Sequence, residues 1–64
     1  MKAKEIIKAI EADGWKLVRH ESSHRTFVKD GVEKVITVPG HDRDEVSIGV
    51  VADIRRISGL RLRP

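Results

Sequence analysis

Cysteine is absent from this 64-residue chain, and aromatic residues are scarce: one Trp, one Phe and no Tyr. The lack of cysteine excludes a disulfide scaffold and thiolate zinc sites, and it suits a reducing compartment. With so few aromatic side chains, we do not expect a base-stacking surface of the kind that binds single-stranded nucleic acids. Trp15 is interpreted instead as part of the core or its rim.

Long hydrophobic runs are also missing. The first residues, MKAKEIIKAIEADGW, place a charge every few positions. This pattern matches neither a signal peptide nor a membrane span of ~20 apolar residues. The chain also lacks the glycine-rich loops that bind nucleotides, and its serines lack a nucleophile elbow. We therefore expect a soluble cytoplasmic protein with no membrane association and no cofactor.

Length and charge set further bounds. The length allows one domain, which we place at residues 1–64. A domain of this size buries only ~60% of the surface that its unfolded chain exposes, so it builds one small core. A functional site must then lie on a face or in a shallow groove. Thirteen Lys and Arg against ten Asp and Glu give a net charge of +3, which permits an anionic partner without requiring one.

Two segments have the apolar spacing of amphipathic helices. The first covers residues 3–13 and ends at Asp13-Gly14, because glycine readily takes the left-handed cap conformation. The second begins after Ser47, a suitable N-cap, and ends at Gly59. Its apolar positions are Val50, Val51, Ile54 and Ile57, and those of the first helix are Ala3, Ile6, Ile7 and Ile10.

Between these helices, three segments read as strands: residues 15–20, 24–29 and 33–38. Asp30-Gly31 predicts a tight two-residue hairpin between the second and third strands. The fold class is therefore α+β, in the order α-β-β-β-α, with a three-stranded antiparallel sheet. Two short helices cannot cover both faces, so we expect both on one face and the other face open. Phe27 is the expected inward anchor of the second strand.

The stretch RHESSHRTF holds two of the three histidines. Histidine is more often structural than catalytic, and we expect His20 to be solvated. His24 has Arg25 beside it and Arg19 and Lys29 nearby. Such a histidine can take a proton from a ribose 2′-hydroxyl or give one to a leaving 5′-oxygen. The cations can hold the scissile phosphate. The residue types fit metal-free RNA cleavage, although their spacing alone does not select it.

A metal site is not expected. The histidines lack the spacing of a zinc motif. The acidic run Asp42, Asp44 and Glu45 lacks the glycine and ligand periodicity of a calcium loop, so we interpret it as a solvated loop.

Several landmarks together make the chain resemble the HicA toxins over nearly its full length. The resemblance is carried by Gly14-Trp15 after the first helix, the run Arg19-His20-Glu21-Ser22-Ser23-His24, Phe27, Val38-Pro39 with His41, Gly49, and Ser58-Gly59-Leu60.

The resemblance implies a fold like the double-stranded-RNA-binding domain, a ribonuclease that cleaves mRNA, and a HicB-type antitoxin as protein partner. It makes His24, in the family's Gly-Ser-His motif, the catalytic residue, and His41 is the candidate for a second acid or base. Candidate contacts to RNA phosphates are Arg25, Lys29, Arg19, Ser23, Lys4 and Lys8.

The chain departs from the family pattern at two positions. Ser22 stands where the family has glycine, and serine takes a positive φ less readily. Val50 stands where the family commonly has threonine.

Two other functions fit the residues. One is a non-catalytic RNA-binding module, in which Lys4 and Lys8, one helical turn apart, face the phosphates of a duplex recognised by shape. The other is a protein-interaction module that docks a partner on its open sheet face or edge strand.

Overall fold

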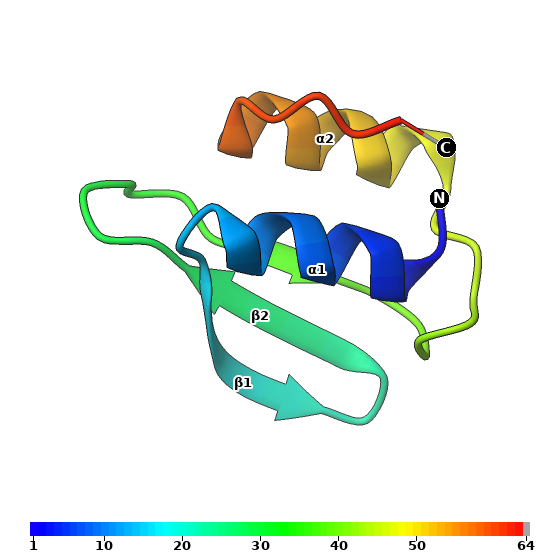
Figure 1. Ribbon diagram of the computed structural model, residues 1–64. Coiled ribbons are helices and arrows are strands. Elements are labelled where there is room, and N and C mark those ends of the chain that lie inside the picture. The colour runs from blue at the N-terminus through cyan, green and yellow to red at the C-terminus, as the bar shows by residue number, and fades with distance from the viewer. Residues whose placement is uncertain (64) are drawn as a thin grey trace.

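A computed structural model describes residues 1–63, and it has the predicted order of one helix, three strands and a second helix (Figure 1). The elements are α1 (Ala3–Ala12), β1 (Lys16–Glu21), β2 (His24–Val28), β3 (Ile36–Val38) and α2 (Ile48–Ser58). The strands form one antiparallel sheet in the order β1-β2-β3. The α+β prediction is confirmed.

Both helices lie on the same face of the sheet, as predicted (Figure 1). Phe27 of β2 is 1% exposed and is the sheet's largest contribution to the core. The core also contains Ile6 and Ile10 of α1, Trp15, Ile36 and Val38 of β3, Val51 and Ile54 of α2, and Leu62. Every residue of β1 is exposed, so the helices cover the sheet mainly over its other two strands.

The helix ends follow the predicted capping chemistry. The Ser47 hydroxyl accepts a hydrogen bond from the Val50 backbone N–H, which satisfies one of the unpaired donors at the start of α2. Gly59 takes the left-handed conformation, with φ +74°, and its N–H donates to the Arg55 carbonyl. The α1 helix ends at Ala12, one residue before the predicted end.

The predicted two-residue hairpin between β2 and β3 is wrong. The turn itself forms, since the Val32 N–H donates to the Lys29 carbonyl at 3.1 Å, but strand pairing begins only at Ile36. A two-residue hairpin would place Lys34 opposite Phe27. The observed register places Ile36 there, and Ile36 is fully buried. Burial of the isoleucine beside Phe27 therefore sets the register, and residues 29–35 form a longer loop.

Candidate nucleic-acid interface

All three histidines lie at one end of the sheet. His20 is the penultimate residue of β1, and His24 is the first residue of β2. The register pairs Glu21 with His24 and, on the other side of β2, Arg25 with Val38. The β1–β2 turn and the loop after β3, which carries His41, are therefore at the same end of the sheet (Figure 1).

The three histidines do not all share a face. His20 pairs directly with Arg25, so both side chains lie on the same side of the sheet as Phe27, which is the side that carries the helices. His24 precedes Arg25 in β2 and points to the open face. Arg25 therefore follows His24 in the sequence, but its guanidinium lies on the opposite face.

On the open face, His24 is exposed, and no hydrogen bond to its imidazole is present within residues 1–63. Its neighbour across the strand pair is Glu21, which forms an ion pair of 3.4 Å with Arg19. Both members of this pair are more than two thirds exposed, so the pair contributes little to stability. Arg19 is the candidate cation on the face of His24.

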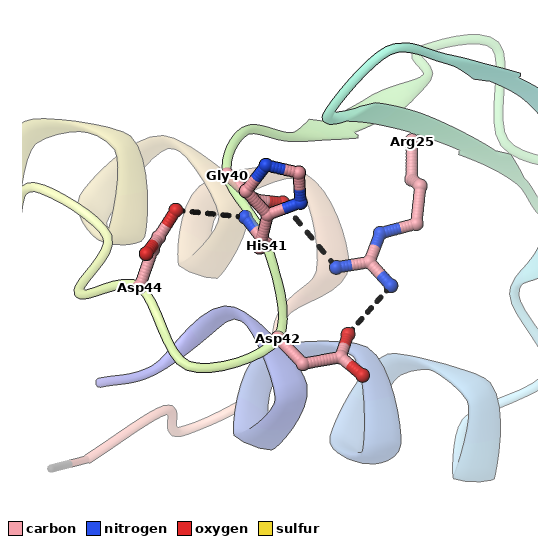
Figure 2. A network of polar contacts seen from close by, with 5 residues as sticks. All are labelled: Arg25, Gly40, His41, Asp42 and Asp44. Carbon is pink, nitrogen blue, oxygen red and sulfur yellow. Dashed lines mark hydrogen bonds and ion pairs between the residues drawn. The ribbon is translucent and has the colours of Figure 1, made fainter.

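The loop that follows β3 is held to β2 by Arg25 (Figure 2). Arg25 Nη1 donates to Asp42 Oδ1 at 2.7 Å, and Nη2 donates to the Gly40 carbonyl at 3.3 Å. Within the loop, the His41 backbone N–H donates to Asp44 Oδ2 at 2.9 Å. The Arg25 side chain is only 15% exposed. This guanidinium therefore restrains the backbone on both sides of His41.

The same loop caps the start of α1. The backbone N–H groups of Ala3 and Lys4 donate to the carbonyls of Asp44 and Asp42 at 2.9 and 3.1 Å. These donors have no partner inside the helix, so the loop supplies the acceptors that a capping side chain otherwise provides. The acidic run is exposed, as predicted, but it is also an anchored part of the fold, because Glu45 pairs with the terminal amine of Met1 at 3.2 Å.

The charges around Asp42 stabilise its ionised form. The hydrogen bond from Arg25 and the positive charge of the guanidinium lower the pKa of Asp42, and Lys4 and His20 add to this shift. Asp42 thus lies beside Arg25 of β2, with Lys4 of α1 and His20 of β1 nearby.

Comparisons with known proteins agree on one family. Residues 3–60 match the family model described as HicA toxin of bacterial toxin-antitoxin. A solved structure titled HicA3 and HicB3 toxin-antitoxin complex contains a similar chain: it has 36% identity, the TM-score is 0.80, and the match covers 98% of this chain and 100% of the other. The chain belongs to the HicA toxin family. No curated protein sequence matches it.

In this HicA-family chain, Ser22 has the conformation that the family's glycine favours. Ser22 and Ser23 form the two-residue turn between Glu21 and His24. The φ of Ser22 is +56°, and within residues 1–63 it is the one residue other than glycine with a positive φ. An L-residue in this region carries strain of roughly 1–2 kcal/mol. The strain lies two residues before His24. Ser23 is half-buried directly before that histidine.

The remaining residues that the resemblance to HicA toxins made candidates for RNA contacts or proton transfer lie in two places. Lys4, Lys8 and His41 line shallow grooves that meet at Arg25. Lys29 lies beyond the far end of β2, about 16 Å along the strand from His24, where its Nζ pairs with Asp13 at 2.9 Å. Lys29 is therefore not brought together with any histidine.

Sequence reasoning missed the position of His20, which it assigned to plain solvated surface. His20 is exposed, as expected, but it lines a groove with Arg25, His41 and Arg43. Only the register places it there, because His20 lies opposite Arg25. Strand alternation without the register gives no such signal.

Two negative findings apply to residues 1–63. No three His, Asp or Glu side chains in this part of the chain are grouped so that they could hold a metal ion. No helix in the same residues is long and apolar enough to cross a bilayer.

Proposed function

We propose that this HicA-family chain is a metal-independent endoribonuclease that cleaves mRNA in the cytoplasm, with His24 as the general acid or base. The observation that carries the proposal is the position of His24 at the end of the Arg19–His24 stretch, which corresponds to the family's Gly-Ser-His motif. Its imidazole is exposed on the open sheet face, at the sheet end where the other two histidines lie. An imidazole without an internal partner has both ring nitrogens available to a substrate.

The proposed reaction needs no group beyond the chain's own residues and the RNA. A base removes the proton of a ribose 2′-hydroxyl, and the oxygen attacks the adjacent phosphorus. The bond from phosphorus to the 5′-oxygen breaks, and an acid protonates that oxygen. The products are a 2′,3′-cyclic phosphate and a 5′-hydroxyl. His24 serves one of these two proton transfers, and His41, at the same end of the sheet, is the candidate for the other.

Cations near this end of the sheet support the proposal. Arg19 lies on the face of His24 and is mostly exposed, so its guanidinium can reach the phosphate as negative charge develops. Arg25 lies on the other face and is held by Asp42 and Gly40. We assign Arg25 to the positioning of the His41 loop and to contacts with phosphates away from the cleaved bond.

The test incubates the purified protein with RNA in EDTA, beside the variants His24→Ala and Lys34→Ala. We expect cleavage by the unmodified protein and by Lys34→Ala, which removes a cation from the loop at the other end of the sheet. We expect a loss of about 100-fold or more for His24→Ala. Equal cleavage by His24→Ala would refute the role of His24, and cleavage that stops in EDTA would refute the metal-independent mechanism. RNA binding without any product would favour the non-catalytic module.

We further propose that a HicB-type antitoxin binds and inhibits this chain. The support is the similar chain, solved in a complex titled as a toxin-antitoxin pair. Because His24 lies on the open sheet face, an antitoxin bound to that face can cover it. Coexpression with a HicB-type protein from a neighbouring reading frame, followed by size-exclusion chromatography, tests this. Separate elution of the two proteins would contradict it.

A further inference from the structure

Two shallow grooves on the helix-bearing side meet at Arg25 and Asp42, which line both of them. We name their union the Arg25 groove. One part lies beside the loop after β3 and is lined by His20, Arg25, Gly40, His41, Asp42 and Arg43. The other part lies between α1 and the sheet and adds Lys4, Ile7, Lys8, Glu11, Leu17 and Phe27.

The lining of the Arg25 groove is rich in cations that have no carboxylate partner. Lys4, Lys8 and Arg43 are exposed, and none of them forms an ion pair within residues 1–63. The groove's carboxylates are Asp42, which pairs with Arg25, and Glu11. Four cations thus face two carboxylates, and His20 and His41 add two groups that can carry a proton.

Arg25 is a rigid cation where the two parts join. Of its five N–H donors, one on Nη1 and one on Nη2 are used, by Asp42 and the Gly40 carbonyl. The Nε donor is buried and has no acceptor in the described structure. Because the side chain is 15% exposed, its charge is less screened than that of a surface arginine.

We propose that the Arg25 groove binds the phosphodiester backbone of an RNA strand beside the cleavage position, and that a phosphate replaces Asp42 on Arg25. This inference rests on the proposed ribonuclease function. The groove starts at the sheet end that carries His24 and continues along α1, where Lys4 and Lys8 lie about 6 Å apart along the helix axis. A strand engaged at His24 can therefore extend into it.

The chemistry of the groove selects a backbone ligand. Among its polar side chains, cations and histidines outnumber the two carboxylates, Asp42 and Glu11, and they match phosphate oxygens. The aromatic lining is limited to Phe27, whose ring is buried in the core. The groove therefore has no exposed Phe, Tyr or Trp ring on which a base can stack, and its exposed rings are the imidazoles of His20 and His41.

Asp42 has a specific part in this proposal. In the protein alone, its carboxylate occupies Arg25 and lowers the positive potential of the groove. A phosphate that replaces it gains the bidentate geometry that guanidinium groups offer to phosphates. Removal of the Asp42 charge should then strengthen RNA binding, whereas a purely structural Asp42 would leave RNA binding unchanged or weaken it.

The experiment measures binding and not cleavage. The probe is a short, fluorescein-labelled, mixed-sequence single-stranded RNA with 2′-O-methyl riboses, which lacks the attacking hydroxyl. Fluorescence anisotropy gives the dissociation constant over salt concentrations of about 50 to 200 mM. Thermal unfolding by circular dichroism verifies that each variant is folded.

The first comparison is between two double variants with the same charge change. For Lys4→Ala with Lys8→Ala, we expect binding about tenfold weaker and a salt slope smaller by about 1.4, which is 0.7 for each of two lost phosphate contacts. The control is Lys34→Ala with Arg55→Ala, which removes two exposed cations outside the groove. We expect the control to change binding by less than about twofold. Equal weakening by both pairs would overturn the proposal.

The second comparison is between two carboxylates that each pair with an arginine. We expect Asp42→Asn to strengthen RNA binding about threefold, because it removes negative charge from the groove. Asp53→Asn removes the same charge from an exposed pair with Arg56 on α2, and we expect little change. Weaker or unchanged binding by Asp42→Asn overturns the proposal. If the groove binds an acidic peptide instead, the same differences between the variants and their controls would appear with polyglutamate as the probe and not with RNA. That result would also overturn the proposal.

The outcome is separable from that of the proposed function. If the groove variants weaken binding of the uncleavable RNA but natural RNA is never cut, the ribonuclease proposal fails and the groove stands as an RNA-binding site. If RNA is cut and the groove variants bind like their controls, only the groove proposal fails.

Discussion

Arg25 Nη1 lies 2.7 Å from Asp42 Oδ1, and this ion pair joins strand β2 to the loop that carries His41. The same guanidinium donates to the Gly40 carbonyl, and the backbone of Asp42 caps α1. Arg25 and Asp42 together therefore connect the sheet, the loop and the first helix at the end of the molecule where the histidines lie. Removal of the Arg25 side chain should therefore affect both the stability and the function of the protein.

Arg25→Ala should lower the free energy of unfolding by about 1–3 kcal/mol, because the side chain is mostly buried and the substitution removes its hydrogen bonds and packing. The control is Arg56→Ala, which breaks the exposed pair with Asp53 on α2 and should change stability by less than about 1 kcal/mol. Urea unfolding followed by circular dichroism measures both. Equal losses would show that Arg25 does not anchor the loop.

The Asp42 interaction should disappear in acid. Its pKa in the folded protein is lowered from 3.8, mainly by Arg25. A lowered folded pKa means that the charged form stabilises the fold at pH values above 3.8, and that this contribution is lost as pH falls through the folded pKa. The difference in urea midpoint between the unmodified protein and Asp42→Asn should therefore shrink as pH falls from 6 to about 2.

An Arg25→Ala background supplies the control for this pH dependence, because it removes the largest causes of the shift. There, Asp42→Asn should change the urea midpoint by a similar amount at both pH values. A difference that persists unchanged at low pH with Arg25 present would contradict the assigned cause.

Ser22→Gly should stabilise the protein. Glycine relieves roughly 1–2 kcal/mol of strain at φ +56°, and the added freedom of the unfolded chain offsets about 0.5–1 kcal/mol of this gain. A net gain of about 0.5 kcal/mol corresponds to a rise in melting temperature of about 2–4 °C for a chain of this size. Ser23→Gly is the matched control, and it should lower the melting temperature because Ser23 has no positive φ.

Phe27→Ala should remove most of the stability. The ring is 1% exposed at the centre of the core, and a truncation of this kind costs about 3–5 kcal/mol. A 64-residue chain has about 3–10 kcal/mol in total. Val18→Ala on β1, where the side chain is 59% exposed, should remain close to the unmodified protein in thermal unfolding. A fully stable Phe27→Ala variant would contradict the assigned core.

Local patterns in the sequence were enough to predict the element order, the caps at Ser47 and Gly59, and the inward position of Phe27. These features depend on residues a few positions apart, because helical and strand periodicities and capping bonds are local. The positive φ of Ser22 was indicated only by the resemblance, because the family pattern has glycine at this position.

Only the tertiary structure decided how the polar groups are grouped. The burial of Ile36 beside Phe27 set the register of β3 and made the preceding loop longer than its Asp30-Gly31 turn predicted. The pairing of His20 with Arg25 placed that histidine in a groove on the helix-bearing side. These relationships depend on side-chain packing and strand register, which the periodicity of a single strand or helix does not specify.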